Sequence, residues 1–189
     1  MYEYSNMPMF LRNSPRVLFS TLGLLRRNMG NCPRDVKAAC YTTLVRPQLE
    51  YGSTIWDPHT SKNIKSLEMV QSRSIRFVCN NYRKGSSPSE MISRLGWETL
   101  AERRSNAKAT MVFKINNSLI DIPRTMFNPT TPHGCRSNAC FEVPFCRTNT
   151  FMNTFFPSAI RIWNGLAPHF RNKKSIESLK RELYKERVN

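Results

Sequence analysis

Acidic residues are scarce in this 189-residue chain, in which 13 Asp and Glu stand against 29 Lys and Arg, for a formal net charge of +16. Three of the acids are aspartates, Asp35, Asp57 and Asp121, and none of them has an acidic neighbour in the sequence. Acid/base pairs and two-metal centres need carboxylates that lie close together. We therefore predict that the chain by itself is not an enzyme.

Glycine is also scarce, with seven residues, and the glycine-rich loops that cradle phosphates do not occur in the sequence. Neither G-x-x-x-x-G-K-[ST] nor the dinucleotide-binding pattern G-x-G-x-x-G is found. The three histidines, His59, His133 and His169, form no recognisable catalytic pattern with a nucleophile. We therefore expect no cofactor.

Long apolar runs are missing, so the sequence predicts no membrane-spanning helix, which needs roughly 20 apolar residues. The N-terminal stretch MYEYSNMPMFLRNSPRVLF lacks the basic region and the apolar core of a signal peptide. We expect an intracellular protein, in the nucleus or the cytoplasm, with no membrane partner. In a reducing compartment the six cysteines would be thiols or metal ligands rather than disulfides.

The cysteines include no C-x-x-C pair, the spacing that is typical of structural zinc sites. His133 and the run Cys135-x4-Cys140-x5-Cys146 place four soft ligands within 14 residues, which leaves zinc open as a minor alternative. The remaining cysteines fall at helix starts or on apolar faces, where cysteine packs as a small apolar residue. We predict no metal site and no requirement for zinc in folding.

The excess of positive charge is the strongest feature that the sequence does have. A compact chain of charge +16 repels itself, and a polyanion whose counterions are released on binding relieves that repulsion. Nucleic acid is the leading candidate partner on this basis. An anionic membrane surface and a solvated basic surface without a partner are the alternatives.

Apolar residues recur at helical spacing along most of the chain, so we predict a mainly α fold. Residues 1–15 show no clear period and are interpreted as a loose leader, and residues 16–120 as a helical unit. Residues 121–189 form a smaller C-terminal unit, in which prolines between 123 and 157 rule out long helices. We expect an irregular or short β element there, followed by terminal helices near 158–166 and 175–188.

Within the first unit we expect helices at about 16–29, 34–45, 61–80, 88–96 and 100–119, with Pro47 kinking or breaking the second. Ser87-x-x-Glu90 and Thr99-x-x-Glu102 match the capping box that begins a helix. Trp97 lies between the two boxes. We interpret it as a core anchor, with a base-stacking role as the alternative.

The helix predicted over 61–80 has two distinct faces. Its apolar residues fall in one broad arc of a helical wheel: Ile64, Leu67, Val70, Ile75, Phe77 and Val78. Lys62, Lys65, Arg73 and Arg76 fall in a separate arc roughly opposite. One face can be buried while the other binds phosphates. The alternative is a solvated face on an ordinary amphipathic helix.

Four strings occur in order along the chain: TLGLLRRNMGNCPRDVKAACYTTLVRPQLEYGSTIWDPHT at 21–60, LEMVQSRSIRFV at 67–78, LGWETLAERR at 95–104 and FFPSAIRIWNGLAP at 155–168. The first resembles the region after the polymerase core in non-LTR retrotransposon reverse transcriptases of the chicken-repeat and jockey-like kinds. The others look like that family's LE-x-VQ-x-R-x-x-R-F, L-x-W-x-x-L-x-x-RR and FFP-x-x-I-x-x-WN-x-LP elements, with Ala167 between the leucine and the proline. The resemblance covers about 20–187.

This resemblance implies a thumb-like helical segment followed by the C-terminal domain of the element's protein, parts that are thought to grip template and primer. The family's catalytic aspartate pair, in an F/Y-x-D-D loop, and its endonuclease domain do not occur here. Residues 1–15 also depart from the family. We predict an accessory portion of an RNA-directed DNA polymerase that binds RNA or an RNA–DNA duplex. The alternative is an inert translated remnant of a transposable element.

Binding of this kind would go mainly through backbone phosphates, with little readout of base sequence. Arg and Lys side chains that share a surface would supply the contacts. The cations that we predict to bind nucleic acid are Arg26, Arg27, Lys62, Lys65, Arg73, Arg76, Arg83, Lys84, Arg103 and Arg104.

Overall fold

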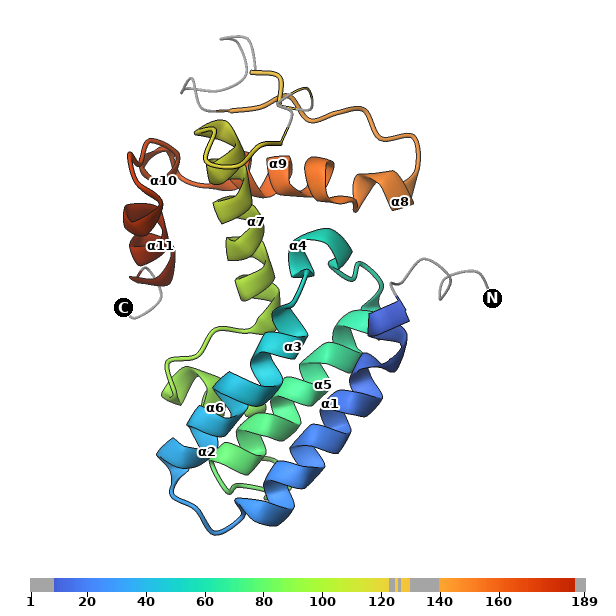
Figure 1. The fold of residues 1–189 in the computed structure, drawn as a ribbon, viewed down its shortest axis with the longest axis vertical. Helices are drawn as coiled ribbons and strands as arrows, with labels where there is room; N and C mark the ends of the chain where they lie inside the picture. Colours follow the sequence, from blue (N-terminus) through green and yellow to red (C-terminus); the bar gives the residue numbers. More distant parts are fainter. Residues whose placement is uncertain (1–8, 123–124, 126, 130–139, 186–189) are drawn as a thin grey trace. The chain divides into compact units, whose positions relative to one another are not determined.

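The computed structural model describes residues 9–122, 125, 127–129 and 140–185, which are mainly helical and contain no β-sheet (Figure 1). The predicted mainly α fold is confirmed. The chain divides into two compact units, Met1–Glu102 and Arg103–Asn189. From the sequence we predicted this division near residue 120, because the prolines that follow rule out long helices. The structural division follows packing instead.

The first unit holds α1 (Met9–Asn28), α2 (Arg34–Cys40), the π-helical turn η1 (Tyr41–Val45), α3 (Arg46–Glu50), α4 (Ser53–Trp56), α5 (Ser61–Val78), α6 (Pro88–Arg94) and the start of α7 (Leu100–Asn116). α1 and α5 pack side by side and run in the same direction, whereas α2, η1 and α3 run in the opposite direction (Figure 1). The buried core of this unit consists of Leu18, Leu22, Leu25, Tyr41, Val45, Leu49, Leu67, Val70, Phe77, Val78 and Leu100.

The helix α1 begins earlier than the sequence indicates. It starts at Met9, so residues 9–15 are helical and do not belong to the loose leader that we predicted; residues 1–8 lie outside the described residues. The apolar period is clear only from Leu18 onward. Once a helix has formed, each added residue gains one backbone hydrogen bond at little further cost. A weakly patterned stretch can therefore extend a well-anchored helix.

Pro47 does not end the helical path that begins at Arg34. The π-helical turn η1 directly precedes α3, and there the N–H of Arg46 donates to the carbonyl of Tyr41, five residues back. Proline has no N–H, and its ring collides with the carbonyl four residues earlier in a regular α-helix. The wider π-helical turn accommodates the ring. The path continues to Glu50 and buries Leu49, so of the two outcomes that we predicted for Pro47, a kink or a break, the structure excludes the break.

Both predicted capping boxes lie at helix starts. In the second, the N–H of Glu102 donates to Thr99 Oγ1 at 3.2 Å, and the N–H of Thr99 donates to Glu102 Oε2 at 2.9 Å. In the first, Ser87 Oγ accepts from the N–H of Glu90 at 3.5 Å. The second box thus has both reciprocal bonds and the first has one of them, and each bond satisfies an N–H group that has no partner within the helix.

Trp97 joins the core of the first unit from the link between α6 and α7. Its ring stacks on that of Tyr41 with the centroids 4.9 Å apart and an interplanar angle of 19°. Beside this link the buried Gln71 donates from Nε2 to the carbonyl of Glu98 at 3.0 Å. The link is therefore fixed to α5 and to η1, and the core-anchor interpretation of Trp97 is confirmed.

The second unit contains most of α7 together with α8 (Asn149–Met152), α9 (Phe155–Gly165), α10 (Pro168–Arg171) and α11 (Ile176–Lys185). Its core consists of Ala109, Val112, Phe113, Ile115, Phe127, Phe141, Ala159, Ile160, Trp163, Phe170, Leu179 and Leu183. Where we expected an irregular or short β element, the described residues contain one antiparallel bridge, between Pro129 and Phe141, and a stretch without regular secondary structure over residues 142–148, up to α8.

None of the helices in the described ranges is both long enough and apolar enough to cross a membrane.

Candidate nucleic-acid interface

A basic surface lies along the junction of α1 and α5, and we call it the α1/α5 face. Two contacts define it, Arg73 over Phe19 and Arg26 over Tyr82. We include Lys62 and Lys65, which share the Arg73 arc of α5 by helical position, and Arg83 and Lys84, which directly follow Tyr82 in the sequence. The opposite arc of α5 is buried at Leu67, Val70, Ile75, Phe77 and Val78, as the helical wheel predicted. Burial of that arc fixes the rotation of the helix. The cationic arc is therefore held toward solvent.

Two arginines of this face lie over aromatic rings that come from the neighbouring segment. The Arg73 guanidinium of α5 is 4.5 Å from the ring centroid of Phe19 on α1. The Arg26 guanidinium of α1 is 4.9 Å from the ring centroid of Tyr82, just after α5. In a stacked guanidinium the N–H donors lie in the plane of the group, which leaves them able to bind a phosphate. Both arginines are exposed.

The other cations of the α1/α5 face are exposed at its two ends. Lys62 and Lys65 project from the first turns of α5, on the same arc as Arg73, while Arg83 and Lys84 follow Tyr82 beyond its last turn. Arg27, which we also predicted, is exposed on α1 and lies farther from α5 on the helical wheel than Arg26.

Arg76 has a structural role that the sequence did not reveal. Its Nη1 donates to Ser86 Oγ at 3.1 Å and to the carbonyl of Arg83 at 3.4 Å, and its Nη2 donates to the carbonyl of Ser86 at 3.0 Å. The guanidinium thus holds the turn between α5 and α6. We leave Arg76 out of the α1/α5 face because three of its five N–H donors are already engaged in this turn.

Arg103 and Arg104 belong to the second unit, whereas the other eight predicted cations belong to the first. Arg104 is 4% exposed and Arg103 is half-buried. A guanidinium buried to this extent cannot reach a phosphate without local unfolding. Arg104 is therefore removed from the predicted phosphate-binding set, since helical spacing alone did not show which side of α7 would be covered.

Further exposed cations lie in the second unit, where we predicted few. This unit carries 15 of the 29 Lys and Arg but five of the 13 Asp and Glu, so most of the excess charge is there. Its exposed cations include Arg147, Arg161, Lys174, Lys180 and Arg181. The charge of each unit, rather than of the whole chain, is the sequence signal that could have indicated them.

The cysteines do not build a metal centre in the described part of the chain, where no three His, Cys, Asp or Glu side chains are grouped to hold a metal ion. Cys32, Cys40, Cys79 and Cys146 are free thiols. Cys140 is disulfide-bonded, contrary to the expectation that all cysteines would be reduced. The candidate ligands His133 and Cys135 lie outside the described residues.

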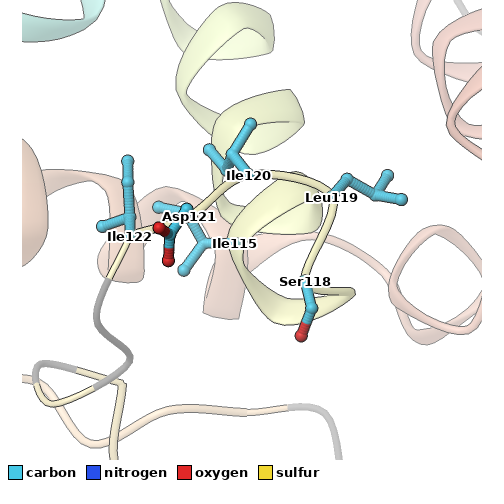
Figure 2. Close-up of a pocket in the computed structure, with 6 residues that line it drawn as sticks. All are labelled: Ile115, Ser118, Leu119, Ile120, Asp121 and Ile122. Carbon is cyan, nitrogen blue, oxygen red and sulfur yellow. The ribbon is translucent and has the colours of Figure 1, made fainter.

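One small hollow lies where α7 ends, and Figure 2 shows its six lining residues spread around a single turn. Ser118 adopts a left-handed φ of 52°, and the N–H of Leu119 donates to the carbonyl of Lys114 at 2.9 Å, which closes the helix end. The hollow of about 260 Å³ has one ionisable side chain, Asp121, and its other lining residues are Ser118 and four apolar residues. We regard it as the surface of a helix cap rather than as a catalytic site.

Comparison with models of known protein families, with curated proteins and with solved structures gives no match to this chain.

Proposed function

We propose that this protein binds RNA or an RNA–DNA duplex through phosphate contacts made by the α1/α5 face. The observation that carries the proposal is the clustering of exposed cations on one face, two of them stacked on aromatic rings, over a helix whose opposite arc is buried. Fixed cations lose less conformational freedom on binding than mobile ones. The face is therefore better organised for a polyanion than a uniformly solvated helix surface would be.

The dimensions of the face suit a nucleic-acid backbone. Lys62 and Arg73 are eleven residues apart on α5, which corresponds to about 16 Å along the helix at 1.5 Å per residue. A duplex carries one phosphate about every 3.4 Å along each strand, so several phosphates fall within this span. Contacts to phosphates carry little sequence information. We accordingly expect binding that depends weakly on base sequence and strongly on salt.

The wider assignment rests on the resemblance of the four ordered strings. They support the proposal that the chain is the thumb-like and C-terminal portion of a non-LTR retrotransposon RNA-directed DNA polymerase. In that setting the α1/α5 face would hold template and primer while another part of the polymerase performs the chemistry. The competing view is an inert translated remnant, which would have no selected binding surface.

The test compares single-charge variants of the full chain. Lys65→Gln and Lys84→Gln each remove one exposed cation, from opposite ends of the α1/α5 face. Arg94→Gln is the matched control, because Arg94 is exposed on α6, which packs on the Ile75 side of α5, away from this face. Affinity for RNA, DNA and hybrid duplexes is measured at several salt concentrations.

We expect each lysine variant to reduce the slope of log affinity against log salt by about 0.7 to 0.9, and the control to leave it unchanged. Equal slopes for all three variants would remove the α1/α5 face from the binding surface. Urea unfolding of the parent chain tests the alternative that the protein is an inert translated remnant. A folded domain unfolds cooperatively, and a gradual, non-cooperative loss of helix would favour the inert remnant.

A further inference from the structure

Two exposed phenylalanines lie near each other in the sequence of the second unit. Phe145 is 90% exposed, more than any other large apolar side chain in the described part of the chain, and Phe151 is 38% exposed. Large aromatic side chains usually contribute to a core, because burying them is favourable. The aromatic cluster of Phe127, Phe141, Phe155 and Phe156 is close by in the sequence, yet Phe145 is not part of it.

The backbone on the N-terminal side of Phe145 is anchored to α9. The N–H of Phe141 donates to Asn164 Oδ1 at 3.0 Å, and Asn164 Nδ2 donates to the carbonyl of Phe141 at 2.7 Å. From there the chain passes back along α9 to α8 (Figure 1). Pro144 restricts the backbone next to Phe145, and its carbonyl accepts from Cys146 Sγ at 3.1 Å. The exposed ring is thus carried by a constrained segment.

Phe151 is fixed from both ends of the short helix α8. Its N–H donates to Thr148 Oγ1 at 3.2 Å, and its carbonyl accepts from Thr154 Oγ1 at 2.7 Å. The carbonyl of the following residue, Met152, accepts from Arg161 Nη2 at 3.0 Å. Arg161 therefore lies beside the turn that carries Phe151.

The charge around these rings is positive. Arg147 and Arg161 are both exposed, and Glu142 is the single acid in the sequence from 140 to 165. A guanidinium has five N–H donors, so the contact with Met152 occupies part of what Arg161 can donate. Exposed aromatic rings among cations match the composition of surfaces that bind single-stranded nucleic acid, where bases stack on rings and the cations follow the backbone.

We propose that the segment 144–151, together with Arg161, is a second contact that holds unpaired nucleotides. Bases stack on Phe145 and Phe151, and Arg147 and Arg161 donate to the neighbouring phosphates. This site extends the proposed function without using any residue of the α1/α5 face. Its ligand is a single strand, because paired bases already stack on one another and offer no free face to a protein ring.

The experiment measures fluorescence anisotropy of the full chain with a labelled oligouridine, a labelled oligothymidine and a labelled duplex. Phe145→Ala is the main variant, because a side chain that is 90% exposed contributes little to folding. Val143→Ala is its matched control, two residues away on the same segment and 42% exposed. Arg147→Gln tests the phosphate contact.

We expect Phe145→Ala to weaken single-strand binding by about 5- to 150-fold, the range for loss of one base–aromatic stack, with duplex binding changed less than about 2-fold. Its salt slope stays that of the parent, because no charge is lost. Arg147→Gln lowers the single-strand slope by about 0.7. Val143→Ala binds both ligands as the parent does.

Unchanged single-strand affinity in Phe145→Ala would overturn the proposal. The exposed Phe145 ring would then be expected to contact a protein partner instead. Equal weakening by Phe145→Ala and Val143→Ala would overturn it as well, because the effect would then come from general apolar contact. The two binding proposals fail separately. If Lys65→Gln leaves duplex binding unchanged while Phe145→Ala still weakens single-strand binding, only the α1/α5 face is rejected. If Lys65→Gln changes duplex binding while Phe145→Ala leaves single-strand binding unchanged, only the stacking site is rejected.

Discussion

The side chain of Asn164 forms hydrogen bonds with both main-chain polar groups of Phe141. The side-chain amide of Asn164 accepts from the N–H of Phe141 at 3.0 Å and donates to its carbonyl at 2.7 Å. The amide thereby acts as a neighbouring strand would, in a region where the described residues contain no sheet. The ring of Phe141 can then pack into the core of the second unit, 7% exposed, without leaving its main chain unpaired.

Replacement of Asn164 should therefore destabilise the second unit. We expect Asn164→Ala to lower the free energy of unfolding by about 1–3 kcal/mol, because two hydrogen bonds are lost. Asn164→Asp keeps the acceptor but replaces the donor with a negatively charged oxygen facing the carbonyl of Phe141, so its loss should be at least as large. Urea unfolding followed by circular dichroism gives both values.

The control for this pair is Asn172→Ala, which removes an exposed amide just after α10 and should stay within about 0.5 kcal/mol of the parent. If Asn164→Asp were as stable as the parent chain, the donated hydrogen bond to Phe141 would have no energetic role.

A second stability test compares Arg76 with Arg73, which lie on the same arc of α5 but have different contacts. Arg76→Gln removes three hydrogen bonds to the turn at Arg83 and Ser86 and should cost about 1–3 kcal/mol. Arg73→Gln, by contrast, alters an exposed side chain over Phe19 and should cost no more than about 1 kcal/mol. Thermal or urea unfolding of the two single variants decides the matter. Equal stabilities would contradict the structural role of Arg76.

The sequence was most informative where structure depends on local pattern. The buried arc of α5 follows from the 3.6-residue period, and the Thr99–Glu102 box follows from two side chains that bond to backbone within one turn. Both signals lie within a few residues of the feature they predict. They therefore needed no knowledge of tertiary packing.

The features that the sequence did not reveal depend on which groups face a residue in the folded chain. A helical wheel gives the direction of Arg76 but not the presence of Ser86, ten residues later, within reach of its guanidinium. The burial of Arg104 likewise depends on how distant segments pack. At Pro47 the sequence could not decide between a kink and a break, because a π-helical turn can accommodate proline and the sequence carries no distinct sign of such a turn.

The last prediction concerns catalysis by the isolated chain. Asp35 lies in the first turn of α2 and Asp57 follows α4, and the helical path from Asp35 to Glu50 alone is about 22 Å long at 1.5 Å per residue; Asp121 lies in the second unit. Phosphoryl transfer by two metal ions requires neighbouring carboxylates. In a primer-extension assay with Mg²⁺ or Mn²⁺ we expect no template-dependent incorporation, while an active reverse transcriptase assayed in parallel extends the same primer. Incorporation that copurifies with this chain, and that is lost in Asp35→Asn or Asp57→Asn, would show that a catalytic centre forms by a route the present arrangement does not provide.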